Sequence, residues 1–279
     1  LASVLAHLES QPDILDEFPE IRIFYLIYRC LSDPDNTEDF DTLKSTLQQH
    51  AHRFPKGDLL EMYGYAINFC IRKINRGNPE YLGTLLEIYQ WALDQEVLLM
   101  NGWLSQWDYK NIVSASLRAN EYTWCADFIE DYKQKIEPES RENAYTYNLA
   151  SLLFERGDYG TAMRTLQHVA FSDVFYQLGG RALLLKCFYE LDDYEALTSL
   201  CDSYKVYLKR NQTLSAHHQG IHRNLISFTK KAADLRNKLP FISAKEGQKK
   251  VEKLLAAMAE KGNISQGKWL KEKVSALQK

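Results

Sequence analysis

The hydrophobic residues of this chain recur at the spacing of amphipathic helices. Segment 144–155 places its apolar side chains three or four residues apart, at Tyr145, Leu149, Leu152 and Leu153. That spacing gathers them on one face of a helix. The next segment continues the pattern with Ala162, Leu166 and Val169. Because a single helix pair cannot bury all of its apolar surface, we expect neighbouring pairs to stack against one another.

Short polar turns separate these helices at regular intervals. Five aromatic residues each follow such a turn, at Phe40, Tyr81, Tyr122, Tyr159 and Tyr194. They are 41, 41, 37 and 35 residues apart, which is the length of one unit in known helical repeats. In the turn before Tyr159, Gly157 suits a left-handed helix end and Asp158 suits the cap of the next helix. The pattern predicts an all-α fold.

The C-terminal part of the chain predicts further helices that close the stack. Residues 213–237 form one long amphipathic pattern that ends before Pro240. Ser243 and Glu246 have the spacing of a capping box, so we expect the next helix to begin there and to run through Ala259. A last helix follows it.

The repeat residues resemble those of tetratricopeptide repeats. One unit reads Thr146-x2-Leu149-Ala150-x2-Leu153, then Gly157, Tyr159 and Ala162-x3-Leu166. The unit that begins at Arg181 is similar, and the unit that begins at Tyr109 is a degenerate third copy. The resemblance covers residues 105–208 and implies a right-handed superhelical solenoid of antiparallel helix pairs. Residues 1–104 then fit as diverged helix pairs and residues 209–279 as a basic C-terminal helical cap, in one continuous array.

Charge is unevenly distributed along the chain. The formal net charge is -3, but residues 205–279 contain 17 Lys and Arg against 5 Asp and Glu, a balance of +12. Residues 1–204 contain the other 17 Lys and Arg and 32 Asp and Glu, a balance of -15. A basic segment of this kind attracts nucleic acid, an acidic protein or anionic lipid.

Composition and motifs argue against several classes of protein. The 13 Gly and 7 Pro are too few for a turn-rich all-β fold, and no apolar run approaches the ~20 residues of a membrane span. The five cysteines are widely spaced without a C-x-x-C pair, so we expect buried thiols in a reducing, cytoplasmic setting. No phosphate-binding, zinc-protease or serine-hydrolase motif occurs. We therefore expect no enzyme activity and no cofactor.

The histidines offer one weak metal-binding pattern. His218 and His222 are four residues apart, a spacing at which two imidazoles on one helix face chelate a divalent metal. No third ligand is evident nearby. The alternative is a pair of ordinary surface or packing histidines, and we predict no metal site.

The resemblance also implies where a partner binds. In such arrays the first helix of each pair lines the concave face. We expect a partner-binding groove on these helices that includes Trp107, Lys110, Asn111, Ser114, Arg118, Tyr147, Asn148, Ser151 and Lys186. These side chains suit a peptide, because amides pair with its backbone and cations with its carboxylates. The alternative is a polar groove without a dedicated ligand.

The basic segment offers a second candidate surface. Lys245, Lys249, Lys250 and Lys253 cluster on one predicted helix. Lys predominates over Arg, which does not favour base-specific readout of nucleic acid. Few aromatic residues interleave with the cations, which weakens a single-strand stacking mode. The alternative is a solvated capping surface, or one that docks on an acidic surface of the same protein or of a second copy.

These features predict a non-catalytic interaction scaffold that binds a peptide or protein partner on the concave face of the helical array. The alternative function is a nucleic-acid-associated helical repeat protein that uses the Lys-rich C-terminal helices, with binding that falls steeply as salt rises. A third hypothesis is self-association through the acidic and basic parts of the chain, which predicts an oligomer that dissociates with salt.

Overall fold

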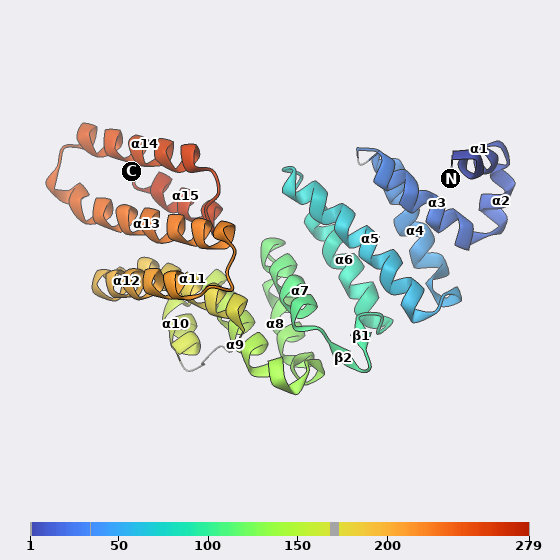
Figure 1. Ribbon diagram of the computed structural model, residues 1–279, viewed down its shortest axis with the longest axis horizontal. Helices are drawn as coiled ribbons and strands as arrows, with labels where there is room; N and C mark the ends of the chain where they lie inside the picture. The colour runs from blue at the N-terminus through green and yellow to red at the C-terminus, as the bar shows by residue number, and fades with distance from the viewer. Residues whose placement is uncertain (1, 34, 168–172, 279) are drawn as a thin grey trace. The chain divides into compact units, whose positions relative to one another are not determined.

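The computed structural model describes residues 2–33, 35–167 and 173–278 (Figure 1). The described elements are almost entirely helical, so the predicted all-α fold class is confirmed. The chain divides into two compact units, unit 1 up to Arg141 and unit 2 from Glu142 onward. In the described residues, no helix combines the length and the apolar character that crossing a membrane requires.

Unit 1 is a succession of helices joined by short turns. Its α-helices are α1 (Ala2–Ser10), α2 (Pro12–Glu17), α3 (Pro19–Ser32), α4 (Thr37–His50), α5 (Lys56–Asn75), α6 (Tyr81–Asp94), α7 (Gln106–Arg118), α8 (Tyr122–Asp131) and the first turn of α9 (Pro138–Glu155). Two short 3-10 helices, η1 (Ala51–Arg53) and η2 (Lys133–Lys135), follow α4 and α8. Consecutive helices from α3 to α8 contact one another, and α3 also contacts α5. Neighbouring helices in this unit therefore pack as the sequence predicts.

Two of the turn aromatics belong to the core of unit 1. Phe40 of α4 stacks on Phe69 of α5, with ring centroids 4.1 Å apart. Tyr81, the first residue of α6, packs against both rings at centroid distances of 6.1 and 6.0 Å. Phe40 and Phe69 are almost fully buried, and burial of each stabilises the fold by roughly 1.5–3 kcal/mol.

A small β-hairpin interrupts the helices between α6 and α7. Strand β1 (Leu99–Met100) pairs antiparallel with β2 (Trp103–Leu104). Asn101 and Gly102 join the strands with positive φ angles of 51° and 83°, the conformation of an Asn-Gly hairpin turn. The helical prediction did not include this hairpin, because its strands are too short to give an alternating hydrophobic pattern.

Unit 2 continues the succession of helices. It contains the rest of α9, then α10 (Tyr159–Gln167), α11 (Val174–Glu190), α12 (Tyr194–Arg210), α13 (Ala216–Lys238), η3 (Leu239–Phe241), α14 (Ala244–Lys261) and α15 (Gly267–Ala276). Consecutive helices from α10 to α15 contact one another, and α13 also contacts α11 and α15. The Ser243 hydroxyl caps α14 by accepting the Glu246 backbone N–H at 3.3 Å. The predicted start of this helix is thus confirmed, and its end lies two residues beyond the predicted Ala259.

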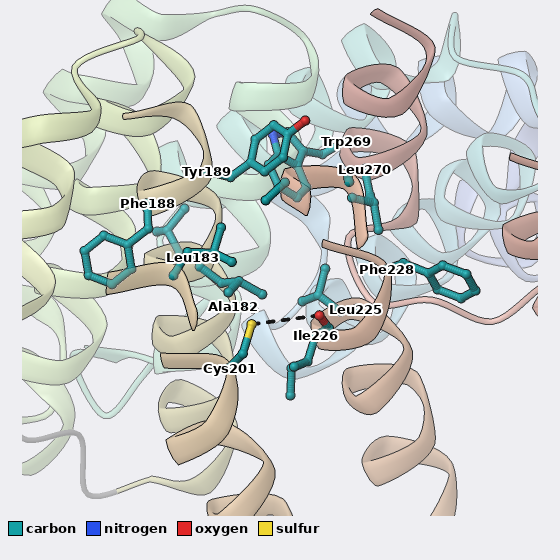
Figure 2. Packing of buried hydrophobic residues seen from close by; sticks show 14 of the residues in the cluster. Ala182, Leu183, Phe188, Tyr189, Cys201, Leu225, Ile226, Phe228, Trp269 and Leu270 are labelled. Atoms are coloured by element: carbon teal, nitrogen blue, oxygen red, sulfur yellow. Dashed lines mark hydrogen bonds between the residues drawn. The ribbon is translucent and has the colours of Figure 1, made fainter. Parts of the chain in front are cut away.

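The core of unit 2 joins helices that are far apart in sequence (Figure 2). Apolar side chains of α11, α13 and α15 meet there, among them Leu183, Phe188, Leu225, Ile226 and Leu270. Tyr189 and Trp269 meet edge to face, with ring centroids 5.5 Å apart. The Cys201 sulfur lies 3.9 Å from the Ile226 carbonyl oxygen, the contact dashed in Figure 2.

All five cysteines are free and buried, as the sequence predicts. Burial raises the pKa of Cys30 and Cys201 to about 11 and that of Cys70 and Cys187 to about 12. These thiols are therefore protonated at neutral pH and pack as small hydrophobic groups.

One turn geometry ends five of the described helices, among them α6, where Glu96 has φ 54° and the Val97 N–H bonds the Ala92 carbonyl at 2.8 Å. The other four ends follow the regular spacing seen in the sequence. Gly77, Asn120, Gly157 and Asp192 each adopt a left-handed φ between 59° and 99°. In each turn the next residue donates its N–H to the carbonyl five residues earlier, as Asp158 does to Leu153 at 2.9 Å. This is the Schellman helix end. Four of the five turns predicted from the sequence, those before Tyr81, Tyr122, Tyr159 and Tyr194, therefore share one structure.

Replacing Gly157 by alanine is expected to destabilise the protein by about 1 kcal/mol, because a side chain is strained at its φ of 84°. Gly220 provides the matched control. It lies inside α13 with no atom within 4 Å of a built Cβ, so alanine there is expected to stabilise the protein by about 0.5–1 kcal/mol. Equilibrium urea unfolding followed by circular dichroism measures both. Equal effects of the two substitutions would contradict the role given to Gly157.

Candidate functional site: an acidic and aromatic groove

Five of the nine predicted groove residues lie on α7 in unit 1. Trp107, Asn111, Ser114 and Arg118 are exposed. Lys110 is partly buried, with its ammonium 5.8 Å from the centroid of the Trp107 ring. These positions recur every three or four residues, so they mark one side of α7.

Three more lie on α9 in unit 2, and one of these is fully enclosed. Asn148 is 1% exposed, and its Nδ2 donates to the Ala144 carbonyl at 2.8 Å. Tyr147 and Ser151 are partly buried, and the Ser151 hydroxyl donates to the Tyr147 carbonyl at 2.8 Å. The Asn148 amide is therefore engaged inside the unit and does not face a partner.

The ninth predicted residue, Lys186 of α11, is also enclosed. It is 5% exposed, and its ammonium lies 4.0 Å from the Phe154 ring centroid. The nearest carboxylate oxygen, on Glu155, is 3.7 Å away. Burial lowers the pKa of Lys186, and the charge of Glu155 opposes that effect. Lys186 is a packing residue of unit 2 and is not among the residues that line the α6–α8 groove.

A groove on unit 1 runs between α6 and α8. Its wider part has a volume of about 690 Å³ and its narrower part about 130 Å³, and the two parts share Gln90 and Trp124. The α6 side presents one helix face, with Gly83, Glu87, Gln90 and Asp94. Arg118 is the predicted groove residue that lines it.

A row of aromatic side chains forms the opposite wall. Trp124 and Phe128 of α8 and Tyr132, which caps its C-terminus, follow at four-residue intervals, so they lie one above another. The Trp124 and Phe128 rings are stacked, with centroids 5.4 Å apart, and Phe128 and Tyr132 are stacked at 4.9 Å. Phe128 is buried, whereas Trp124 and Tyr132 are partly exposed. Ring surface of both therefore remains accessible from the groove.

Carboxylates surround this aromatic wall. The lining residues include Glu80, Glu87, Glu121, Asp94, Asp127 and Asp131, against a single cation, Arg118. Glu87 is paired with Lys44 at 3.0 Å. None of the ion pairs among the described residues involves Asp94, Asp127 or Asp131. The narrow part of the groove is therefore strongly negative.

The negative charge of the groove affects the pKa of Tyr132. Burial raises the pKa of its phenol, and the charges of Asp94, Asp131 and Glu96 raise it further. A second anion at this position is therefore disfavoured, whereas a cation is stabilised by the same carboxylates.

The predicted basic patch lies on α14 of unit 2. Lys245, Lys249, Lys250 and Lys253 are all exposed. Lys250 pairs with Glu246 at 2.7 Å, one helical turn earlier. Lys250 and Lys253 line a second groove, between α13 and α14, whereas Lys245 and Lys249 lie outside its lining. The structure thus separates the four lysines into two pairs.

The α6–α8 groove is not evident from the sequence, although the sequence contains a signal for each wall. Glu80, Glu87 and Asp94 are seven residues apart, and the three aromatics of the opposite wall are four apart. Either spacing places its residues on one helix face. Neither pattern indicates that the two faces border one groove, because that depends on the tertiary structure.

The fold defines this chain as an all-helical protein built of packed neighbouring helices. No family model, curated protein or solved structure matches it. Its function is therefore inferred from its own surfaces.

Proposed function

We propose that this chain is a non-catalytic interaction module that binds a cationic segment of a protein partner in the α6–α8 groove. The observation that carries the proposal is the aromatic wall of α8 beside carboxylates that have no ion-pair partner. Arg and Lys side chains gain from both features. Their charge pairs with a carboxylate, and the guanidinium plane or the aliphatic stem lies on an aromatic ring.

The shape of the groove favours a peptide over a small molecule. It follows two helices, and its α6 wall offers the polar side chains of Glu87, Gln90 and Asp94 in succession. Each helical turn of about 5.4 Å therefore presents a new polar contact. A partner segment with cations at regular intervals makes one such contact per turn.

We further propose that the helix pairs form a tetratricopeptide-like, right-handed superhelical array. The recurring Schellman turns and the contacts between alternate helices, α3 with α5 and α11 with α13, support this arrangement. In such an array α6 and α8 are the second helices of their pairs. The proposed groove thus differs from the concave face expected from the sequence, which first helices line.

Three cysteine and histidine side chains with strongly shifted pKa values lie away from the grooves, which favours binding over acid–base catalysis there. Burial raises the pKa of Cys70 and Cys187 to about 12 and lowers that of His222 to about 4. These side chains are buried, and none of them lines either described groove. Strongly perturbed groups that open to a cleft are the usual mark of an active site.

A fluorescently labelled Arg-rich peptide tests the proposal by fluorescence polarisation. Gly83→Leu is the first variant, because Gly83 lines the groove and a Cβ there meets no atom within 4 Å. Leucine also favours the helix over glycine, so the variant is expected to fold while its side chain fills the groove. We expect at least about tenfold weaker binding, equal to about 1.4 kcal/mol. Gly57→Leu makes the same change on α5, where space is also open, and is expected to bind normally.

A charge-neutralising pair tests the electrostatic part of the proposal. Asp127→Asn with Asp131→Asn is expected to weaken binding about tenfold at low salt. Asp58→Asn with Glu61→Gln removes the same charge from exposed positions of α5. Equal losses of affinity in the two double variants would show that net charge alone attracts the peptide. That result would contradict binding in the groove. Sedimentation of the protein without peptide tests for self-association. An oligomer that dissociates in Gly83→Leu would show that two copies of the chain meet at this groove.

A further inference from the structure

A second groove, of opposite charge, lies between α13 and α14 in unit 2. Its volume is about 380 Å³. Lys231 and Lys238 of α13 and Lys250 and Lys253 of α14 stand along it. On each helix the lining positions follow the spacing i, i+3, i+4 and i+7, so one complete helix face borders the groove from either side.

The floor of this groove is apolar. Leu235 and Leu254 are each 8% exposed, and Ala257 is partly buried. No aromatic side chain is among the residues that line it. The groove therefore combines a small apolar strip with ammonium groups on both edges.

The lysines along the edges are largely available to a ligand. Lys231, Lys238 and Lys253 are exposed and take part in no ion pair among the described residues. Lys250 pairs with Glu246, but that pair is itself half-exposed and therefore weak. Asp234 is the one carboxylate in the lining, and it is occupied by a hydrogen bond from the Tyr194 hydroxyl.

We propose that this groove binds an acidic amphipathic helix of a protein partner. The apolar face of such a helix covers Leu235, Leu254 and Ala257, and its flanking carboxylates meet the lysines on both sides. Nucleic acid fits the groove less well, since phosphates gain nothing from an apolar floor and bases find no ring on which to stack. The site is separate from the α6–α8 groove and selects a partner segment of opposite charge.

A designed peptide about four helical turns long, with Leu on one face and Glu on the others, is the probe. Its scrambled isomer has the same charge but no apolar face. We expect the amphipathic peptide to bind at least about tenfold more tightly than the isomer, since only it buries the apolar floor. Lys231→Glu with Lys253→Glu is expected to weaken its binding about tenfold. Ala257→Gln, which fills the floor without changing charge, is expected to do the same.

Lys245→Glu with Lys249→Glu is the matched control, because both lysines are exposed on α14 but lie outside the groove lining. The affinity of this control variant for the amphipathic peptide is expected to stay within about threefold of the native value at physiological salt, where distant charges are screened.

Thermal unfolding confirms that each variant is folded. Equal binding of the scrambled peptide, equal loss in the control pair, or absence of peptide binding would each overturn the proposal. A DNA duplex that binds more tightly than the peptide and is lost in Lys231→Glu/Lys253→Glu would assign the groove to nucleic acid instead. The Arg-rich peptide is proposed to bind the α6–α8 groove, so failure of one peptide to bind leaves the proposal for the other groove standing.

Discussion

Replacing Glu190 by alanine is expected to destabilise the protein by about 3 kcal/mol. Glu190 is the last residue of α11, and its side chain is 10% exposed. Its carboxylate accepts the Trp269 indole N–H at 2.7 Å and pairs with the Lys273 ammonium at 2.8 Å. Removing one partner of a buried pair costs about 3–5 kcal/mol, because the other group is left desolvated. The lower end applies here, since Lys273 is 31% exposed and water partly replaces the carboxylate.

The same contacts connect α11 to the last helix of unit 2, so the loss is expected to be concentrated there. Glu190→Gln keeps an acceptor for the indole but loses the charge, and is expected to cost about 1–2 kcal/mol. Glu195→Ala, at an exposed position of α12, is expected to change stability by less than about 0.5 kcal/mol. Equilibrium urea unfolding ranks the three variants, and hydrogen exchange reports the protection of α15. If Glu190→Ala loses as little unfolding free energy as Glu195→Ala, the Glu190 carboxylate does not hold α15 in place.

The features of the fold that could be predicted from the sequence are those set by residues close together in the chain. Gly157 and Asp158 specify a helix end and the next cap, and the structure has a left-handed φ at Gly157 and an Asp158 oxygen that accepts the Thr161 N–H. Ser243 likewise caps α14. The hairpin at 99–104 escaped prediction because two-residue strands carry no period.

The candidate site was harder to predict, because exposure depends on residues far away in sequence. A lysine on a helix is ordinarily exposed, yet Lys186 is covered by Phe154 and by Trp269, a residue more distant in the chain. The α6–α8 groove shows the converse. Trp124 and Tyr132 are large aromatic residues, yet they remain partly exposed beside α6. Local periodicity fixes which residues share a face, and tertiary packing decides whether that face is covered.

The two histidines considered as metal ligands illustrate the same distinction. The His218 imidazole is partly buried, edge to face with the Phe175 ring at a centroid distance of 5.6 Å, and its Nδ1 lies 2.9 Å from the Ser215 hydroxyl. His222 is 7% exposed, and its Nδ1 is 2.8 Å from the Tyr204 hydroxyl. That hydroxyl donates to the Leu178 carbonyl at 3.0 Å, so it accepts the N–H of His222 Nδ1. His222 is thus a hydrogen-bonded core residue that joins α13 to α12.

Lowering the pH from 7 to 4 is expected to remove about 3 kcal/mol of stability through His222 alone. Burial, and to a lesser extent the charge of His218, lowers the pKa of His222 from 6.5 to about 4 in the folded protein. Below pH 6.5 the unfolded chain therefore gains a proton at this residue that the folded chain does not accept. The contribution is fully present above pH 6.5 and is lost progressively as the pH falls towards 4.

The difference between the native protein and His222→Gln isolates this effect from the titration of the carboxylates. Urea unfolding is measured at several pH values between 7 and 4. The native protein is expected to lose stability more steeply than His222→Gln, whose side chain does not titrate. His217→Gln removes an exposed histidine from the same helix, and its pH profile is expected to parallel that of the native protein. Parallel profiles for His222→Gln as well would mean that His222 is protonated in the folded protein, and that the interior of unit 2 tolerates the charge.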